Sequence, residues 1–129
     1  MLNYTSGKSF RVQGRGIIHL VNDPERKIKV GEEIILDKEI FEVRKIELSG
    51  NQPEVGLIGK FIKEKILKAS NVYKIRWDEN NLIIYFNNGN TYQYFDVPER
   101  LSVGLSEAVS PGSFLHREIK GNYRYARID

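Results

Sequence analysis

The amino-acid sequence predicts a mainly β protein whose C-terminal part is α+β. Three features of the 129 residues lead to this prediction. Short segments rich in β-branched residues, separated by turn residues, fill the first half. An Asn-Gly pair at residues 88–89 lies between two aromatic runs, which is typical of a hairpin turn. Capping residues followed by helical spacing appear after residue 95. We therefore expect a small β-barrel in residues 1–68 and an α+β domain in residues 69–129.

The N-terminal half contains a series of predicted strands. In residues 40–48, apolar and charged side chains largely alternate, so one face should be buried and the other solvated. Turn residues separate the segments, as at Gly14, Gly31 and residues 49–51. Short strands at this spacing predict a small closed or half-open barrel. The segments are FRV at 10–12, GIIHLV at 16–21, EIIL at 33–36, IFEVRKIEL at 40–48 and EVGLI at 54–58.

Residues 60–70, KFIKEKILKAS, join the two predicted domains. Apolar side chains recur here at roughly helical spacing, with lysines between them and no Gly or Pro. We therefore expect a short amphipathic turn or helix that contains the domain boundary.

The C-terminal half begins with a predicted three-stranded meander, followed by helices. The strands are residues 72–77, 82–86 and 91–95, with turns at 78–81 and 88–89. A helix should follow, because Asp96 can cap it with Glu99 three residues later and Pro98 suits its first turn. Leu101, Leu105 and Ala108 would lie on one face of this helix, which should end at residues 110–112. A second helix at 113–120, with Leu115 and Ile119 together and Gly121 as its stop, and a last strand at 123–128 complete the prediction.

The length of the 88–89 turn decides which side chains of the meander share a face. If the loop has two residues, Tyr85 lies opposite Tyr92 and Ile83 opposite Tyr94. One face then gathers the core residues Tyr73, Ile75, Trp77, Leu82, Ile84, Phe86 and Phe95, and the other gathers Lys74, Arg76, Ile83, Tyr85, Tyr92 and Tyr94. An alternative is that the helix predicted at residues 99–109 covers these tyrosines, since aromatic residues in strands are often packing residues. A bulge or a three-residue loop would also reverse the assignment of the faces.

The mixed face of cations and tyrosines is the candidate binding site. Residues 60–129 carry eleven basic and eight acidic side chains, and 11 − 8 gives the whole net charge of +3. Aromatic rings interleaved with cations suit unstacked bases and phosphates, although a solvated basic face would show the same pattern. The predicted nucleic-acid-binding residues are Lys74, Arg76, Tyr85, Tyr92 and Tyr94, assisted by Lys63, Lys65, Lys68, Arg124 and Arg127.

Several other functions are not expected from this sequence. The chain has no cysteine, which excludes disulfides and thiolate metal sites. His19 and His116 are isolated, so we expect no metal site, and no nucleophile motif indicates an enzyme. We also expect no cofactor. No apolar run approaches a membrane span and no signal peptide is evident, so we expect a cytoplasmic protein without membrane contact.

Part of the N-terminal half resembles the second-domain β-barrel of translational GTPases such as elongation factor Tu. The resemblance rests on FRVQGRG at 10–16, IKVGEEI at 28–34 and VGLI at 55–58, and it covers about residues 10–68. The present chain is shorter between Leu36 and Glu54 and has no GTPase domain. In those factors the barrel contacts the acceptor end of tRNA, so the resemblance implies a barrel fold and a link to RNA.

A spaced set of residues in the C-terminal half, within roughly residues 69–127, carries a second resemblance: Leu82, Phe86, Asn88-Gly89, Tyr92, Tyr94, Asp96-Val97-Pro98, Ala108, Ser110, Gly112, Phe114, Ile119 and Tyr123. This set resembles the KTSC domain, a bacterial module found at the C-terminus of some lysyl-tRNA synthetases and in phage-related proteins. The resemblance implies RNA binding, with RNA or tRNA as partner. The alternative is a protein-interaction or accessory module of phage or mobile-element origin, with a protein partner.

Overall fold

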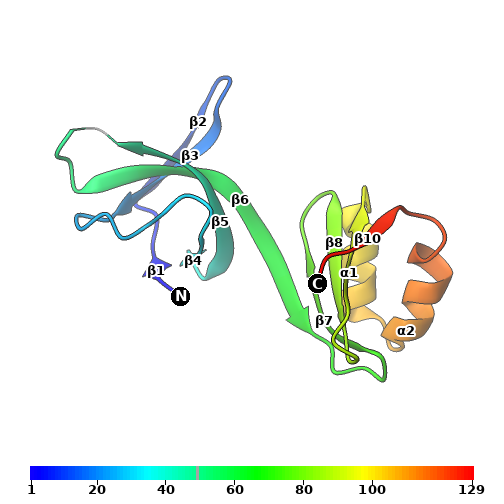
Figure 1. Cartoon of the computed structure of the whole chain (residues 1–129). Coiled ribbons are helices and arrows are strands. Elements are labelled where there is room, and N and C mark those ends of the chain that lie inside the picture. The colour runs from blue at the N-terminus through cyan, green and yellow to red at the C-terminus, as the bar shows by residue number, and fades with distance from the viewer. Residues whose placement is uncertain (49) are drawn as a thin grey trace. The chain divides into compact units, whose positions relative to one another are not determined.

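The computed structural model describes residues 1–48 and 50–129 and shows two compact units, Met1–Ile62 and Lys63–Asp129 (Figure 1). Ser49, part of the turn expected at residues 49–51, lies outside the described residues. Each unit has a hydrophobic core of its own. The chain is mainly β with a helical C-terminal part, as the sequence predicts.

Unit 1 (Met1–Ile62) is built on a sheet with the strand order β1-β4-β5-β6-β3-β2. Neighbouring strands are antiparallel except for the short parallel pair of β1 and β4. The predicted N-terminal strands are confirmed as β2 to β6. The strands are β1 (Asn3–Tyr4), β2 (Lys8–Val12), β3 (Gly16–Asn22), β4 (Glu33–Leu36), β5 (Glu39–Leu48) and the first part of β6 (Glu54–Ile66).

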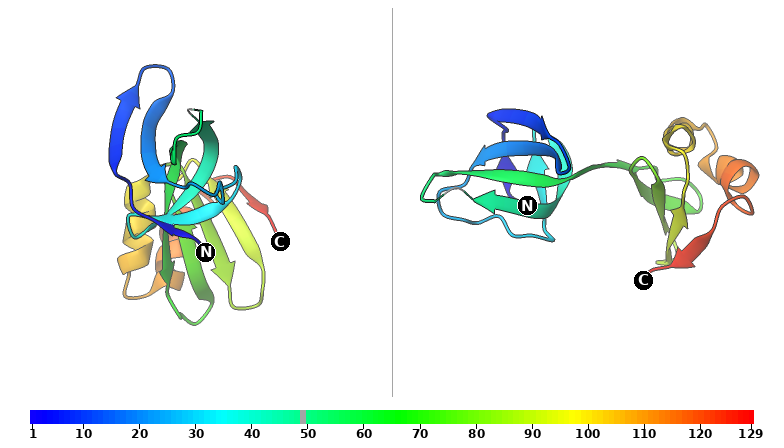
Figure 2. Two further views of the ribbon diagram at one scale, coloured as in Figure 1. Left: turned by 90° about the vertical axis from the view of Figure 1, so that its left-hand side faces the viewer. Right: turned by 90° about the horizontal axis from the view of Figure 1, so that it is seen from above.

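The sheet of unit 1 is open, so of the two predicted forms, a closed and a half-open barrel, the closed form is wrong. Within the described residues, β1 pairs only with β4 and β2 only with β3, which leaves one edge of each strand unpaired. Closure would require these two edges to meet. A two-residue β1 offers few backbone groups for such pairing, and the β2–β3 hairpin projects from the rest of the unit (Figure 2).

One face of this sheet carries the core of unit 1. Phe41, Val43 and Leu57 are completely buried. The rings of Phe41 and Phe61 meet edge to face with their centroids 5.0 Å apart, a preferred aromatic geometry. The predicted burial of one face of the strand at residues 40–48 is therefore confirmed.

The segment between the two units is extended. β6 continues as far as Ile66, so the prediction of a helix or turn at residues 60–70 is wrong for most of its length. The last four residues of β6 pair with β7, with Glu64 opposite Arg76. These pairings outweigh the helical spacing because the intrinsic preference of such a short segment is weak.

Unit 2 (Lys63–Asp129) has an antiparallel sheet with the order β6-β7-β8-β9-β10. The predicted meander and the predicted last strand are confirmed. The helices lie on one side of this sheet (Figures 1 and 2). The elements after β6 are β7 (Val72–Trp77), β8 (Asn81–Phe86), β9 (Thr91–Phe95), α1 (Glu99–Glu107), α2 (Pro111–Phe114), the π-helix η1 (Leu115–Ile119) and β10 (Tyr125–Arg127).

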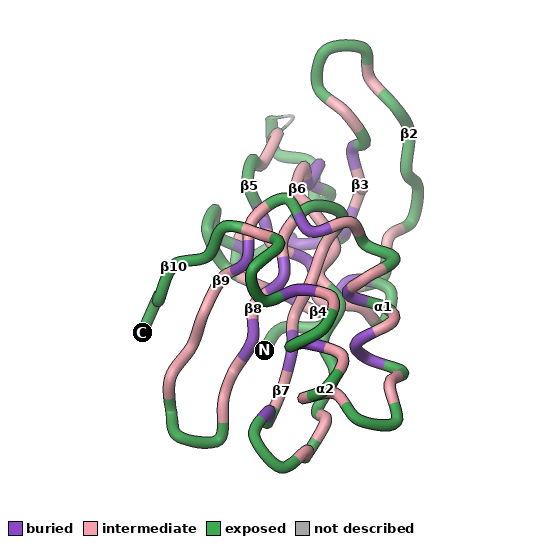
Figure 3. The backbone as a smooth tube through the Cα atoms, turned by 90° about the vertical axis from the view of Figure 1, so that its right-hand side faces the viewer, coloured by how far each residue is buried: buried purple, intermediate pink, exposed green. Residues whose placement is uncertain are grey.

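The core of unit 2 lies between the sheet and the helices (Figure 3). Leu82 and Ile84 are completely buried on the sheet, and Leu105 is completely buried on α1. Leu115 and Ile119 are buried together at the two ends of η1, as their spacing predicts. Within the described residues, no helix is long and apolar enough to cross a membrane.

The start of α1 differs from the prediction. Pro98 is its N-cap, so the assignment of Asp96 as the cap is wrong. Asp96 has a positive φ of 58°, and the next residue, Val97, has a completely buried side chain and an N–H that donates to the Asn80 carbonyl oxygen. The chain is therefore anchored before the helix begins, which keeps the Asp96 carboxylate away from the first helical N–H groups.

Candidate functional site

The hairpin between β8 and β9 has a three-residue loop. The Gly89 N–H donates to the Phe86 carbonyl oxygen at 3.1 Å, and the Phe86 N–H donates to the Asn90 carbonyl oxygen at 2.9 Å. Residues 87–89 therefore form the loop, and Gly89 adopts the left-handed φ of 91° that this kind of loop requires. The two-residue loop is ruled out, and every residue of β9 faces the opposite way from the prediction made with it.

Tyr92 and Tyr94 consequently lie on the helix side of the sheet. Tyr92 is opposite Ile84 and Tyr94 is opposite Leu82, both of which belong to the core. Tyr94 is only 3% exposed. The placement of these two tyrosines on one face with Lys74 and Arg76 is therefore wrong, and the alternative in which they pack beneath the helices is the observed one.

Two further residues leave the predicted core face. A register irregularity between Val72 and Lys74 turns Tyr73 outward, where it is 45% exposed, while Val72 is completely buried. Phe95 alternates with the buried Tyr94 and so points away from the helices. The prediction of Tyr73 and Phe95 as core residues is wrong for these reasons.

The face of the sheet opposite the helices retains part of the predicted site, and we call it the open sheet face. The Lys74 ammonium lies 4.4 Å from the centroid of the Tyr85 ring, and the two residues are opposite each other on β7 and β8. Glu64, on β6, lies 3.3 Å from the Lys74 ammonium and 3.5 Å from the Arg76 guanidinium. One carboxylate is thus shared by two partly buried cations. The open sheet face comprises Glu64, Lys74, Arg76, Ile83, Tyr85, Gln93 and Phe95.

A second cation lies over an aromatic ring at the edge of this face. The Arg124 guanidinium is 5.0 Å from the centroid of Phe95, and it also lies 3.4 Å from the exposed Asp96 carboxylate. The open sheet face therefore contains two cation–aromatic pairs, one centred on Tyr85 and one on Phe95.

The other predicted basic residues point elsewhere. Lys63 and Lys65 alternate with Glu64 along β6, and the Lys65 ammonium donates to the Ser106 carbonyl oxygen near the end of α1 at 2.7 Å. Arg127 lies opposite Tyr92 and pairs with Asp129 at 2.9 Å. Lys68 lies in the connection between β6 and β7. Four of the predicted residues therefore belong to the open sheet face or its edge, namely Lys74, Arg76, Tyr85 and Arg124.

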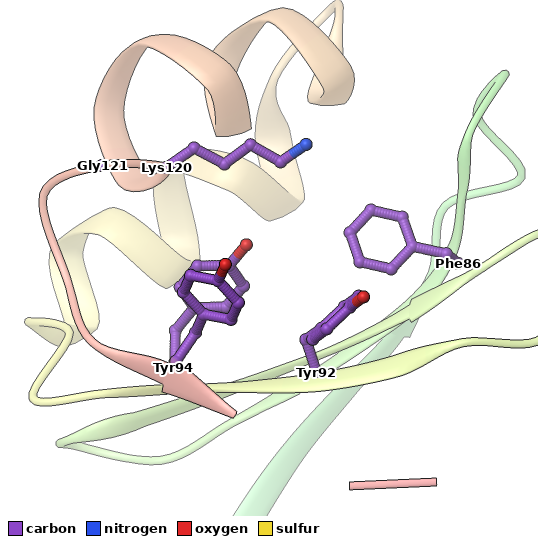
Figure 4. Close-up of a pocket in the computed structure, with 6 residues that line it drawn as sticks. Phe86, Tyr92, Tyr94, Lys120 and Gly121 are labelled. Atoms are coloured by element: carbon purple, nitrogen blue, oxygen red, sulfur yellow. The ribbon is translucent and has the colours of Figure 1, made fainter. Parts of the chain in front are cut away.

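On the helix side, the displaced tyrosines line a pocket of about 430 Å³, which we call the tyrosine pocket (Figure 4). Tyr92 and Tyr94 rise from β9, and Lys120 reaches across from the end of the helices. Gly121, with a φ of 83°, turns the chain toward β10 after η1. The lining residues are Phe86, Tyr92, Tyr94, Lys120, Gly121 and Tyr125.

The aromatic rings of the tyrosine pocket form a connected set. Tyr92 meets Phe86 edge to face at 5.6 Å and meets Tyr125 edge to face at 5.7 Å. Tyr94 and Tyr125 are 5.5 Å apart with an interplanar angle of 33°. Burial raises the pKa of the Tyr94 phenol, and the neighbouring Tyr125 and Tyr92 raise it further.

Sequence reasoning did not find the tyrosine pocket as a site. Lys120, Gly121 and Tyr125 come from the end of the chain and approach β9 only because β10 pairs with it, Tyr125 opposite Tyr94. The available signals were the tyrosine in the predicted last strand and the lysine next to the predicted helix stop.

The two histidines have different surroundings. His19 is half-buried against the rings of Phe41 and Phe61, and its Nδ1 is 2.8 Å from the Ser9 hydroxyl oxygen. Burial lowers the pKa of His19, and the nearby Asp37 opposes this effect in part. His116 is exposed. Across residues 1–48 and 50–129, no group of three or more His, Cys, Asp or Glu side chains could hold a metal ion.

Comparison with known proteins places the C-terminal half in a family. A lysine–tRNA ligase from Trichormus variabilis is 33% identical over 70 residues, and one from a Nostoc species is 31% identical over 70 residues. Each match covers 54% of this chain and 11% of the ligase, so the chain spans about a tenth of the length of these relatives.

A crystal structure of a KTSC domain protein from Yersinia pestis is also similar. It is 34% identical with a TM-score of 0.50, and the match covers 53% of this chain and 99% of that protein. The KTSC domain family model matches residues 68–123. The resemblance of residues 10–68 to translational GTPases lies outside this match and stays a prediction. Through its C-terminal unit, this chain belongs to the KTSC domain family.

Proposed function

We propose that this chain is a non-catalytic RNA-binding protein and that single-stranded RNA or a single-stranded part of tRNA binds to the open sheet face. The observation that carries the proposal is the Lys74 ammonium held 4.4 Å from the Tyr85 ring, beside Arg76, on the side of the sheet opposite the helices. This arrangement offers an aromatic surface and two cations within one short stretch of two strands.

The internal contacts of this site can be exchanged for contacts with RNA. A phosphate that approaches Lys74 and Arg76 replaces the Glu64 carboxylate that they share. When Lys74 turns toward a phosphate, a base can stack on Tyr85, and such stacking contributes about 1–3 kcal/mol per base. Arg124 and Phe95 offer a second pair of the same kind at the edge of the face.

The relatives agree with this proposal. The segment that resembles this chain occurs in two lysine–tRNA ligases, enzymes whose name includes an RNA substrate. This segment corresponds to 11% of the length of each ligase. We propose that it serves the ligases as an accessory RNA contact.

The test is binding of a fluorescent single-stranded RNA of about ten nucleotides, and of tRNA, at about 50 mM and about 200 mM salt. We expect binding at low salt that weakens at high salt. Changing Lys74 and Arg76 to Gln together should weaken binding about tenfold. It should also reduce the slope of the logarithm of the binding constant against the logarithm of the salt concentration by roughly one to two.

A matched double variant controls for the loss of two positive charges. Lys27 and Arg44 are exposed residues of unit 1 that pair with Glu25 and Glu42, respectively. Changing both to Gln should leave RNA binding unchanged. Absence of binding at low salt, or equal weakening by both double variants, would contradict the proposal.

A second candidate function is binding of a protein partner through unit 1. An apolar hollow of about 470 Å³ lies on this unit and is lined in part by Phe10, Ile18 and Leu48, of which Phe10 is 40% and Leu48 is 59% exposed. Unit 1 carries ten basic and nine acidic side chains, and 10 − 9 gives a net charge of only +1. A partner that remains bound after nuclease treatment and is lost on Phe10→Ser would support this function.

A further inference from the structure

The tyrosine pocket is separate from the open sheet face, because its residues project from the other side of the same strands. Tyr92 and Tyr94 alternate along β9 with Gln93, which faces Ile83 on the open side. The RNA-binding proposal concerns the open sheet face, so it assigns no role to the tyrosine pocket.

The pocket has walls suited to a flat ring. Phe86, Tyr92 and Tyr125 meet in two edge-to-face contacts with interplanar angles of 78° and 81°, so adjacent walls stand nearly at right angles. A planar aromatic group placed there stacks on one wall and meets the edge of the next, which are the favourable geometries for aromatic pairs. The volume of about 430 Å³ falls within the range of small-molecule sites, about 300–1,000 Å³.

Three tyrosines that line the pocket bring hydroxyl groups to it, those of Tyr92, Tyr94 and Tyr125. Tyr94 is 97% buried, yet its hydroxyl is not among the buried side-chain atoms that lack a hydrogen-bond partner in the described part of the chain. The Tyr94 hydroxyl is therefore accessible from the pocket, where a ligand can form a hydrogen bond with it.

The charge of the pocket selects among ligands. Lys120 is the charged residue among those that line it, and its ammonium lies 5.8 Å from the centroid of Phe86. Aromatic pockets also bind quaternary ammonium groups, but a lysine at the same place repels a cation. A ligand with an anionic group is favoured instead.

We propose that the tyrosine pocket binds a nucleoside monophosphate, with the base against the rings of Tyr92 and Tyr125 and the phosphate at Lys120. This ligand combines a planar ring, hydrogen-bonding atoms for the tyrosine hydroxyls and an anion for the lysine. The same chemistry is present in a free nucleotide and in the terminal nucleotide of an RNA chain. The π-helix that ends beside Lys120 agrees with this proposal, since single π-turns are frequent at functional sites.

The experiment is a calorimetric and NMR titration of the full chain with adenosine monophosphate, with adenosine as the ligand that lacks the phosphate. We expect saturable binding of the monophosphate and binding of adenosine that is about tenfold weaker, because a charge-assisted contact is lost. Lys120→Gln should weaken binding of the monophosphate to the level of adenosine and leave adenosine binding unchanged.

Two further variants keep the test interpretable. Tyr125 is 61% exposed, so Tyr125→Ala should fold normally and weaken both ligands. Tyr94→Phe keeps the buried ring and removes only the hydroxyl. Tyr73→Ala, at a tyrosine that is 45% exposed and belongs to neither site, is the matched control and should bind the monophosphate as the unaltered chain does.

The proposal is overturned if the unaltered chain does not bind the monophosphate, or if Lys120→Gln and Tyr125→Ala both bind it normally. It does not depend on the RNA proposal, because Lys120→Gln leaves Lys74 and Arg76 intact. A short RNA with a terminal phosphate, titrated into the variant in which Lys74 and Arg76 are both changed to Gln, distinguishes the two sources without a contribution from the open sheet face. Tighter binding of the RNA identifies a chain end, and tighter binding of the monophosphate identifies a free nucleotide.

Discussion

Tyr94 lies directly opposite Leu82 across β8 and β9, with its ring in the core of unit 2 and only 3% of its surface exposed. This pairing fixes the faces of the whole hairpin. It separates the tyrosines of β9 from Tyr85 on β8 and so divides one predicted site into two, the open sheet face and the tyrosine pocket. The two sites can be tested separately, because a variant in one leaves the side chains of the other in place.

Neutralising Glu64 should strengthen RNA binding. Glu64 lies within 3.5 Å of both Lys74 and Arg76 and competes with any phosphate for them. We expect Glu64→Gln to raise the affinity for single-stranded RNA by roughly twofold to fivefold at low salt, and less at high salt, because salt ions compete with the two cations for the RNA phosphates. Fluorescence anisotropy measures the change. Glu99→Gln, at an exposed position of α1, removes the same charge away from the site and is the control. An unchanged affinity in Glu64→Gln would argue against the open sheet face as the binding site.

Adding one methyl group at Gly59 should destabilise unit 1. A Cβ at this position would lie 1.9 Å from the Glu42 carbonyl oxygen and 2.9 Å from the Phe41 ring, so the paired strands would have to move apart. We expect Gly59→Ala to cost about 1–3 kcal/mol in the free energy of unfolding, measured by urea denaturation. Gly7→Ala is the matched control, because its nearest neighbour would be the Glu54 carboxylate at 4.0 Å. Equal stability of the two variants would show that Gly59 is not needed for close packing.

Truncation of Leu105 should destabilise unit 2. Leu105 is a completely buried apolar residue of α1 and packs in the core with Leu115 and Ile119. Leu105→Ala should cost about 2–5 kcal/mol, the range for buried leucines. Val109→Ala, at a fully exposed position after α1, should change stability by less than about 0.5 kcal/mol. A small effect of Leu105→Ala in thermal and urea unfolding would contradict the assignment of α1 to the core.

The stability of unit 1 should fall as the pH drops through the ordinary pKa of histidine. Burial between Phe41 and Phe61 lowers the pKa of His19 below its usual value of 6.5. The unfolded chain then takes up a proton at a higher pH than the folded chain, so stability is retained above about pH 6.5 and lost below it. Thermal denaturation from pH 7.5 to 5 measures this loss.

His19→Gln isolates the contribution of this histidine to the pH dependence. The amide side chain can still hydrogen-bond Ser9 but does not titrate, so the variant should lose less stability than the unaltered chain over the same range. Hydrogen bonds from Ser6 lower the pKa of Asp37 below its ordinary value of 3.8. Protonation of Asp37 therefore reduces stability only near and below pH 3.8, outside the range of this experiment. An identical pH profile for the variant and the unaltered chain would contradict the assignment to His19.

Local patterns in the sequence predicted most of the elements of both units. Alternating and β-branched runs gave the strands between Phe10 and Ile58 and between Val72 and Phe95, and the spacing of Leu115 and Ile119 gave their common face. These predictions succeeded because the residues involved are close in sequence, and their burial follows from the period of a strand or a helix. The resemblance to the KTSC domain was also present in the sequence.

Tertiary pairing decided the rest. The strand conformation of Lys63 to Ile66 depends on β7, and the openness of the sheet in unit 1 depends on which strands find a partner. The tyrosine pocket depends on residues more than twenty-five positions apart, Tyr94 and Lys120. Most decisive is the one extra residue in the loop before Gly89, since a strand presents alternate residues to opposite faces and a shift of one position reverses them all. The sequence by itself placed the tyrosines and cations on three paired strands, and only the tertiary structure decided which of them share a face.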